Sequence, residues 1–188
     1  TLVPQDRPLV TFALFAYNQE KYIREAVEGA FAQTYEPLEI ILSDDCSSDR
    51  TFEIMQEMAA VYEGPHEVVL NQNCINLGLI GHVNLISDLA KGDYIAAAAG
   101  DDISLPHRIK VVSEEIIKSH PLLIHSSVKR INEDGSLQHE IPNNPTLWNT
   151  HDPKLAATSG SLYIGATGIW SKVLFEKYGK IKSLKSYE

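Results

Sequence analysis

The sequence predicts an α/β fold in which a central, mostly parallel sheet is flanked by helices. Short apolar runs of strand length alternate with longer segments whose apolar residues recur at helical spacing. This alternation predicts parallel strands joined by right-handed crossovers, and strands that are apolar throughout are typical of a sheet covered on both faces. A chain of 188 residues is long enough for one domain with a single substantial core.

Four strand–helix units open the chain and set this prediction. The predicted strands are 9–15, 37–42, 67–70 and 94–99, and the predicted helices are 20–33, 50–62, 79–89 and 106–119. Asn18 is placed to cap the first helix, and Ser48 or Asp49 the second. Pro106 suits the first turn of the fourth helix.

The pattern weakens in the last third of the chain. A fifth strand is predicted at 121–131, then a turn at 133–135 and a long loop up to residue 160. A short helix is predicted at 172–178, ending at Gly179.

Two pairs of acidic residues stand where predicted strands end. Asp44 and Asp45 follow the second strand, and Asp101 and Asp102 follow the fourth. Ligands of α/β sheets bind beyond the carboxyl ends of the strands, and carboxylate oxygens suit a hard divalent cation. We therefore expect one ligand-binding edge, formed by 16–18, 44–47 and 100–102.

Composition excludes several classes of protein. The net charge of −9 argues against general nucleic-acid binding. Cys46 and Cys74 lack metal-type spacing and are expected to be reduced thiols in a cytosolic protein. No apolar run approaches the ~20 residues of a membrane span. No phosphate-loop or dinucleotide glycine motif is present.

Five motifs, each at the end of a predicted strand or close to one, now occur in a recognisable order. They are Phe15-Ala16-Tyr17-Asn18-x-Glu20, Ser43-Asp44-Asp45-Cys46-Ser47-Ser48-Asp49-Arg50-Thr51, Asn76-x-Gly78, Lys91-Gly92-Asp93-Tyr94-Ile95 leading to Gly100-Asp101-Asp102, and Gly165-Ala166-Thr167-Gly168. In this order the chain resembles the family 2 glycosyltransferases, which have the GT-A nucleotide-sugar fold, over about residues 8 to 188.

The resemblance implies an inverting transfer of a sugar from a UDP-sugar to a hydroxyl of a glycan or a lipid-linked sugar, as in surface polysaccharide synthesis. It implies a cytoplasmic protein, with a peripheral place at the inner face of the membrane and a homodimer both left open. The chain would be a single GT-A domain over 1–188, cut short at its C-terminus. Its nucleotide-binding half would cover about 8–105 and its acceptor-side half about 106–188.

The resemblance also assigns nucleotide contacts, each with an alternative. The residues that would bind the nucleotide-sugar are Phe15, Ala16, Tyr17, Glu20, Asp45, Asn76, Gly78 and Asp101. Asp45 would accept a hydrogen bond from the uracil N–H, because a carboxylate only accepts, with Asp44 as the alternative. Phe15 and Tyr17 could instead pack the core. Asn76 and Gly78 could form an ordinary turn, and Glu20 could anchor a loop or begin a helix.

Asp101 and Asp102 would hold a divalent metal, Mn²⁺ or Mg²⁺, that stabilises the UDP leaving group. The sequence departs from the family pattern at Gly100, the first position of the family's Asp-x-Asp metal motif. It departs again at Val83, where some members carry an arginine. Glu188 looks like the start of the acidic motif that supplies the catalytic base, whose second acidic residue this sequence lacks.

Two rival functions remain open. One is a non-catalytic or degenerate homologue that still binds a nucleotide-sugar. The other is a receiver-type phosphoacceptor domain, which would need a lysine after a late strand, and Lys129 has no clear strand-end context.

Overall fold

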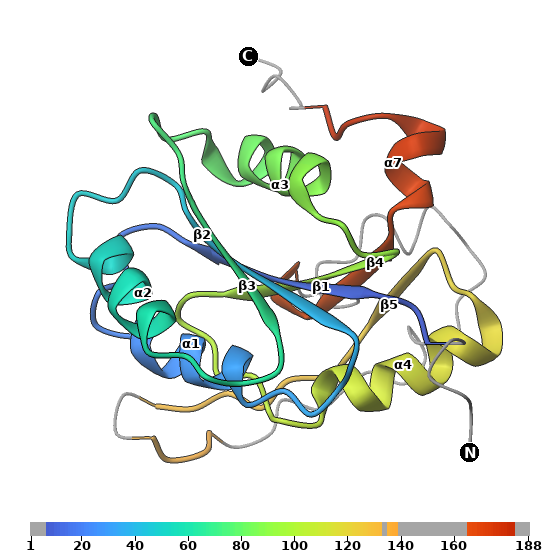
Figure 1. Cartoon of the computed structure of the whole chain (residues 1–188), viewed down its shortest axis with the longest axis horizontal. Helices are drawn as coiled ribbons and strands as arrows, with labels where there is room; N and C mark the ends of the chain where they lie inside the picture. Colours follow the sequence, from blue (N-terminus) through green and yellow to red (C-terminus); the bar gives the residue numbers. More distant parts are fainter. Residues whose placement is uncertain (1–6, 133–134, 139–164, 183–188) are drawn as a thin grey trace.

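A six-stranded sheet lies at the centre of the computed structural model, which describes residues 7–132, 135–138 and 165–182 (Figure 1). The strand order is β3-β2-β1-β4-β6-β5. The strands are β1 Val10–Ala16, β2 Leu38–Asp44, β3 Glu67–Gln72, β4 Tyr94–Ala99, β5 Leu123–His125 and β6 Gly168–Ser171. The first four are parallel neighbours, and β6 runs antiparallel to both β4 and β5. The predicted mostly parallel sheet is confirmed.

Helices cover both faces of this sheet. The described helices are α1 Ile23–Phe31, α2 Thr51–Ala60, α3 Gly78–Leu89, α4 Arg108–Ser119 and α7 Val173–Tyr178. One hydrophobic cluster packs α1, α2 and α4 against one face, and a second joins the other face to α3 and α7. The two clusters explain why β1 and β4 are apolar along nearly their whole length and why β2 is buried throughout.

Most predicted elements are confirmed within a few residues, and the main differences lie near the C-terminus. The strand expected at 121–131 forms only the three residues of β5, although Ile131 makes an isolated bridge to Leu137. The strand β6 was not predicted, and only its first residue, Gly168, belongs to the small-residue motif. It pairs with β4 and β5, which are distant in sequence, so a local pattern does not reveal it.

The starts of the helices differ in one instructive way. Asn18 does not cap α1, which begins at Ile23 without a side-chain cap. Asn18 instead adopts a left-handed conformation (φ 52°), and its Oδ1 accepts a hydrogen bond from the N–H of Ser48 at 2.8 Å. Neither Ser48 nor Asp49 caps α2, whose cap position is Arg50, although Asp49 Oδ1 accepts the N–H of Thr51, the first helical residue, at 2.9 Å.

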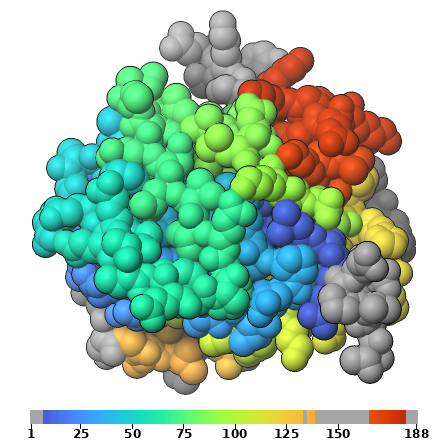
Figure 2. Space-filling model, in the orientation of Figure 1, coloured from blue at the N-terminus to red at the C-terminus, as the bar shows by residue number. Residues whose placement is uncertain are grey.

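The C-terminal segment lies beside α3. Asn84 exchanges two hydrogen bonds of 2.9 Å with the backbone of Ile181, and Lys180 pairs with Asp88. Figure 2 shows the red C-terminal surface against the yellow-green surface of α3. Among the described residues, no helix is long and apolar enough to cross a membrane.

Candidate active site

The carboxyl ends of β1, β2 and β4 meet at one edge of the sheet, as the sequence predicts. Ala16 pairs with Asp44, and the N–H of Asp45 donates to the carbonyl of Ala16 at 2.9 Å. On the other side, the N–H of Gly100 donates to the carbonyl of Phe15 at 2.8 Å. Since neighbouring strands are about 4.8 Å apart, the segments after the three strands emerge side by side.

The loops after β1 and β2 are joined by hydrogen bonds. The N–H of Asn18 donates to Ser47 Oγ at 2.8 Å, and the N–H of Glu20 donates to Asp49 Oδ2 at 3.1 Å. In return, the N–H of Arg50 donates to Glu20 Oε2 at 3.0 Å. Glu20 therefore anchors its loop, one of the two roles that the sequence left open.

Asp44 and Asp45 are both buried but differ in what remains free on each carboxylate. Both oxygens of Asp44 are engaged, by the hydroxyl and N–H of Ser47 and by Gln72 Nε2. Asp45 Oδ1 accepts from the N–H of Leu77 at 2.8 Å and from Asn73 Nδ2 at 2.7 Å. Among the residues that the structure describes, no group donates to Asp45 Oδ2.

A buried histidine stands behind the two aspartates. His82 Nε2 lies 2.5 Å from Ser43 Oγ, and its ring meets that of Phe15 edge-on, with centroids 5.0 Å apart. Burial lowers the pKa of His82, although the charges of Asp45 and Asp44 oppose the shift. His82 is therefore neutral at neutral pH, so it does not supply the positive charge of the arginine that some family members carry at the position of Val83.

Asp101 and Asp102 lie exposed at the end of β4. Although Asp102 is exposed, partial desolvation by the surrounding protein raises its pKa, the charge of Asp101 raises it further, and Arg108 opposes the shift. Within the described ranges, no three His, Cys, Asp or Glu side chains group closely enough to hold a metal ion by themselves. Two adjacent carboxylates fit a divalent cation that takes its other ligands from substrate phosphates and water, which is the usual arrangement for Mg²⁺.

Gly100 has a steric reason to be glycine. A Cβ at this position would lie 2.4 Å from Gln19 Oε1, 2.9 Å from Ala16 Cβ and 3.0 Å from Ile23 Cδ1. Any larger residue would therefore displace the start of the loop after β1. The departure from the Asp-x-Asp motif follows from this close packing.

The other predicted nucleotide contacts lie near the same edge. Tyr17 is 48% exposed, so its ring does not pack the core, whereas Ala16 is buried. Asn76 Oδ1 accepts the N–H of Gly78 at 2.8 Å, and Gly78 has a φ of 66°. These two residues form a turn into α3, as the alternative interpretation had it, and the turn is tied to Asp45 through the N–H of Leu77. Glu188 lies outside the described residues.

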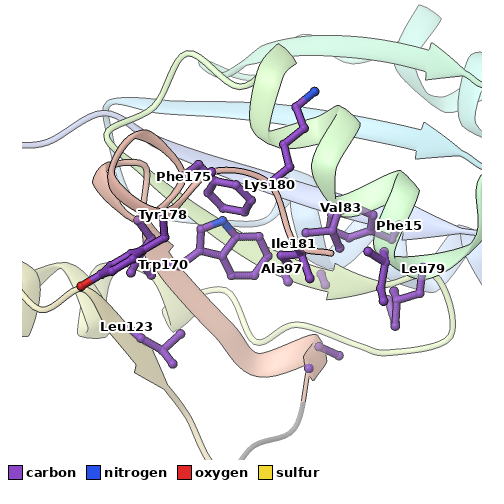
Figure 3. A pocket seen from close by; sticks show the side chains of 17 residues that line it. Phe15, Leu79, Val83, Ala97, Leu123, Trp170, Phe175, Tyr178, Lys180 and Ile181 are labelled. Carbon is purple, nitrogen blue, oxygen red and sulfur yellow. The ribbon is translucent and has the colours of Figure 1, made fainter. Parts of the chain in front are cut away.

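A large cavity lies on the α3 and α7 face of the sheet rather than among the aspartates. It measures about 690 Å³ and is lined mainly by apolar side chains (Figure 3). Of the predicted nucleotide contacts only Phe15 lines it, and Val83 is part of its wall. Gly165 and Ala166, from the small-residue motif, line its side near the end of β4.

Arg108 is a residue that the sequence reasoning missed. It stands at the start of α4 and donates to the carbonyls of Ala97 at 2.7 Å and Ala166 at 3.1 Å. Burial lowers its pKa to about 10, and the charge of Asp102 opposes the shift. Arg108 thus links the small-residue segment around Ala166 to β4 by hydrogen bonds, close to Asp102. No motif marked it, because its partners are backbone carbonyls of distant segments.

Comparison with known proteins agrees with this geometry. The sequence matches the family described as Glycosyl transferase family 2 over residues 11–179. The chain therefore belongs to glycosyl transferase family 2. The receiver-type alternative is wrong, and the strand order also differs from the 2-1-3-4-5 order of receiver sheets.

Curated relatives are longer than this chain. It is 36% identical over 142 residues to the uncharacterized protein Rv1520 of Mycobacterium tuberculosis, covering 71% of this chain and 38% of that protein. It is 33% identical over 131 residues to the chondroitin synthase of Escherichia coli, covering 69% of this chain and 18% of the synthase. The chain thus spans well under half the length of either relative.

Solved structures share the fold at lower identity. Staphylococcus aureus TarS 1-349, in complex with UDP-GlcNAc, has a TM-score of 0.69 at 19% identity, covering 89% of this chain and 46% of that one. The mannosyltransferase PcManGT of Pyrobaculum calidifontis, in complex with GDP-Man and Mn²⁺, has a TM-score of 0.67 at 19% identity, covering 97% of this chain and 50% of that one. These similarities confirm the GT-A fold.

Proposed function

We propose that this chain is the donor-binding domain of an inverting glycosyltransferase that takes its sugar from a UDP-sugar. The observation that carries the proposal is the edge where β1, β2 and β4 end together, with Tyr17, Asp45 and Asp101 on adjacent segments. Family membership and a fold neighbour solved with UDP-GlcNAc support it.

Asp45 is the group proposed to recognise uracil. Its free Oδ2 accepts hydrogen bonds, and uracil presents an N–H where cytosine presents an acceptor. The carboxylate of Asp44 is fully engaged within the protein, which favours Asp45 over that alternative. Tyr17, with its exposed ring, would offer the base a stacking face, and the turn at Asn76 and Gly78 would border it.

Asp101 and Asp102 are proposed to share a divalent cation with the donor diphosphate. Mn²⁺ is bound in one fold neighbour, and Mg²⁺ has the same preference for carboxylate oxygens. The cation would offset the charge that develops on the departing UDP. The protein's own part is to hold two carboxylates at the end of β4, beside the segment that Arg108 fixes.

For the chemical step, the acceptor hydroxyl attacks the anomeric carbon while a carboxylate takes its proton, and the bond to UDP breaks with its electrons leaving on UDP. A single displacement inverts the anomeric centre. Glu188, or an acidic residue following it in the motif, is proposed as that base. A glycan or lipid-linked sugar in surface polysaccharide synthesis is the proposed acceptor, and the similarity to chondroitin synthase supports a polysaccharide. The proposed location is the cytoplasm, at the inner face of the membrane.

Calorimetric titration with UDP in the presence of Mn²⁺ tests the donor site. We expect saturable binding that Asp45→Ala and Asp101→Ala each weaken at least tenfold, which corresponds to the loss of one good charge-assisted hydrogen bond or metal contact. Glu114→Gln, at an exposed position of α4, is the control and should bind as the wild type does. Absence of UDP binding by the folded wild-type chain would rule out the proposal.

A nucleotide-sugar-binding protein without transferase activity is the second candidate. Val83, in the apolar cavity wall where some family members carry an arginine, is the observation that favours it. UDP release from UDP-sugars in the presence of Mn²⁺ separates the two, since only a transferase consumes the donor.

A further inference from the structure

A network of amide and hydroxyl groups runs from His82 to Oδ1 of Asp45, the oxygen that the protein itself engages. Asn73 is 7% exposed and stands just after β3. Its Nδ2 donates to Asp45 Oδ1 at 2.7 Å, and its Oδ1 accepts from Asn71 Nδ2 at 3.0 Å. Asn71 Nδ2 also donates to Ser43 Oγ at 2.9 Å, the hydroxyl that contacts His82.

This network fixes which way the Asn73 amide faces. Because its oxygen accepts from Asn71, its nitrogen must point to Asp45. The N–H of Asn73 also donates to the carbonyl of Asp44 at 2.9 Å, which holds the backbone of the residue in place. The side chain is therefore held on both sides, by Asn71 at its oxygen and by Asp45 at its nitrogen.

We propose that Asn73 is a positioning residue that makes Asp45 selective for uracil, by saturating Oδ1 and leaving Oδ2 as the only acceptor that a bound base can use. The inference rests on the proposed function, in which Asp45 recognises the base. With one oxygen held by Asn73 and by the N–H of Leu77, the carboxylate cannot turn, so a base with an acceptor in place of the N–H meets an uncompensated negative charge.

The test compares the affinities of UDP and CDP, each with Mn²⁺, by calorimetry. Asn73→Ala removes the donor, and Asn73→Asp keeps the shape while placing a second carboxylate against Asp45. We expect both variants to lower the ratio of UDP to CDP affinity by about tenfold, with Asn73→Asp the more severe because it adds repulsion. The metal and diphosphate contacts are the same for both nucleotides, so general damage to the fold lowers both affinities and leaves the ratio unchanged.

Gln72→Ala is the matched control. Gln72 is the neighbouring amide, and it donates to Asp44 Oδ2 at 3.3 Å rather than to Asp45. This variant should keep the wild-type ratio. A wild-type ratio in folded Asn73→Ala or Asn73→Asp overturns the inference while leaving the proposed function intact. A wild-type chain that binds no UDP overturns both.

Discussion

Replacement of Gly100 by alanine tests whether the end of β4 is packed as tightly as the geometry indicates. The added methyl would lie 2.9 Å from Ala16 Cβ and 3.0 Å from Ile23 Cδ1, well inside ordinary van der Waals contact. Gln19 Oε1, at 2.4 Å, would have to move as well, and it now accepts the N–H of Tyr17. The clash therefore falls on the loop that carries Tyr17.

The expected cost follows from two opposing terms. Overpacking by one methyl group destabilises the fold by about 1–3 kcal/mol. Replacing glycine by alanine stabilises it by about 0.4–1 kcal/mol, because the unfolded chain has less conformational entropy to lose. The free energy of unfolding should fall by about 1–2 kcal/mol as the net of these terms. For a chain of this size that corresponds to a decrease in Tm of roughly 2–8 °C.

Urea denaturation and thermal unfolding measure the effect, with Gly165→Ala as the control. A Cβ at Gly165 would meet nothing within 4 Å, so that variant keeps only the unfolded-state term and should be more stable than the wild type by about 0.4–1 kcal/mol. UDP affinity should fall in Gly100→Ala, because the loop bearing Tyr17 shifts. Equal stability of the two variants, with UDP affinity unchanged, would refute the packing argument. Gly100→Asp, which writes Asp-x-Asp into the sequence, should be less stable still and should not bind Mn²⁺ more tightly.

Three further predictions concern charge. Because the pKa of Asp102 is raised, Mn²⁺ affinity should fall on acidification at a higher pH than it would for an ordinary aspartate, which Mn²⁺ titration across pH checks. Ionisation of this group also disfavours the fold, so Asp102→Asn should have a higher free energy of unfolding at neutral pH, which urea denaturation measures. Because the pKa of His82 is lowered, the folded state binds a proton there less readily than the unfolded state, so acidification below about pH 6.5 lowers the free energy of unfolding. In His82→Gln, this decrease on acidification should be smaller. Arg108→Met should lower the free energy of unfolding by about 1–3 kcal/mol in urea, because the carbonyls of Ala97 and Ala166 lose their shared donor.

The edge of the sheet could be predicted from the sequence because strand ends leave local marks. Asp44 and Asp45 end one apolar run, and Asp101 and Asp102 end another. Because the strands are parallel, the ends of both runs lie at the same edge of the sheet. The antiparallel β6 left no comparable mark, since the strands with which it pairs are distant in sequence. Asn18 shows the limit of cap rules, because its side chain bonds across to Ser48 rather than to its own helix.

The resemblance assigned the uracil contact to Asp45 but left Asp44 as the alternative. Asp44 and Asp45 have the same chemistry, and a motif alone leaves their register open. What separates them is the set of donors that the fold supplies: Ser47 and Gln72 occupy the first, whereas Asn73 and a turn N–H occupy one oxygen of the second. Under the proposed function, recognition at this edge would depend on the carboxylate oxygens that the protein leaves without a donor. Buried amides that donate to one oxygen of a carboxylate, as Asn73 does to Asp45, are therefore the first candidates for further specificity residues in this family.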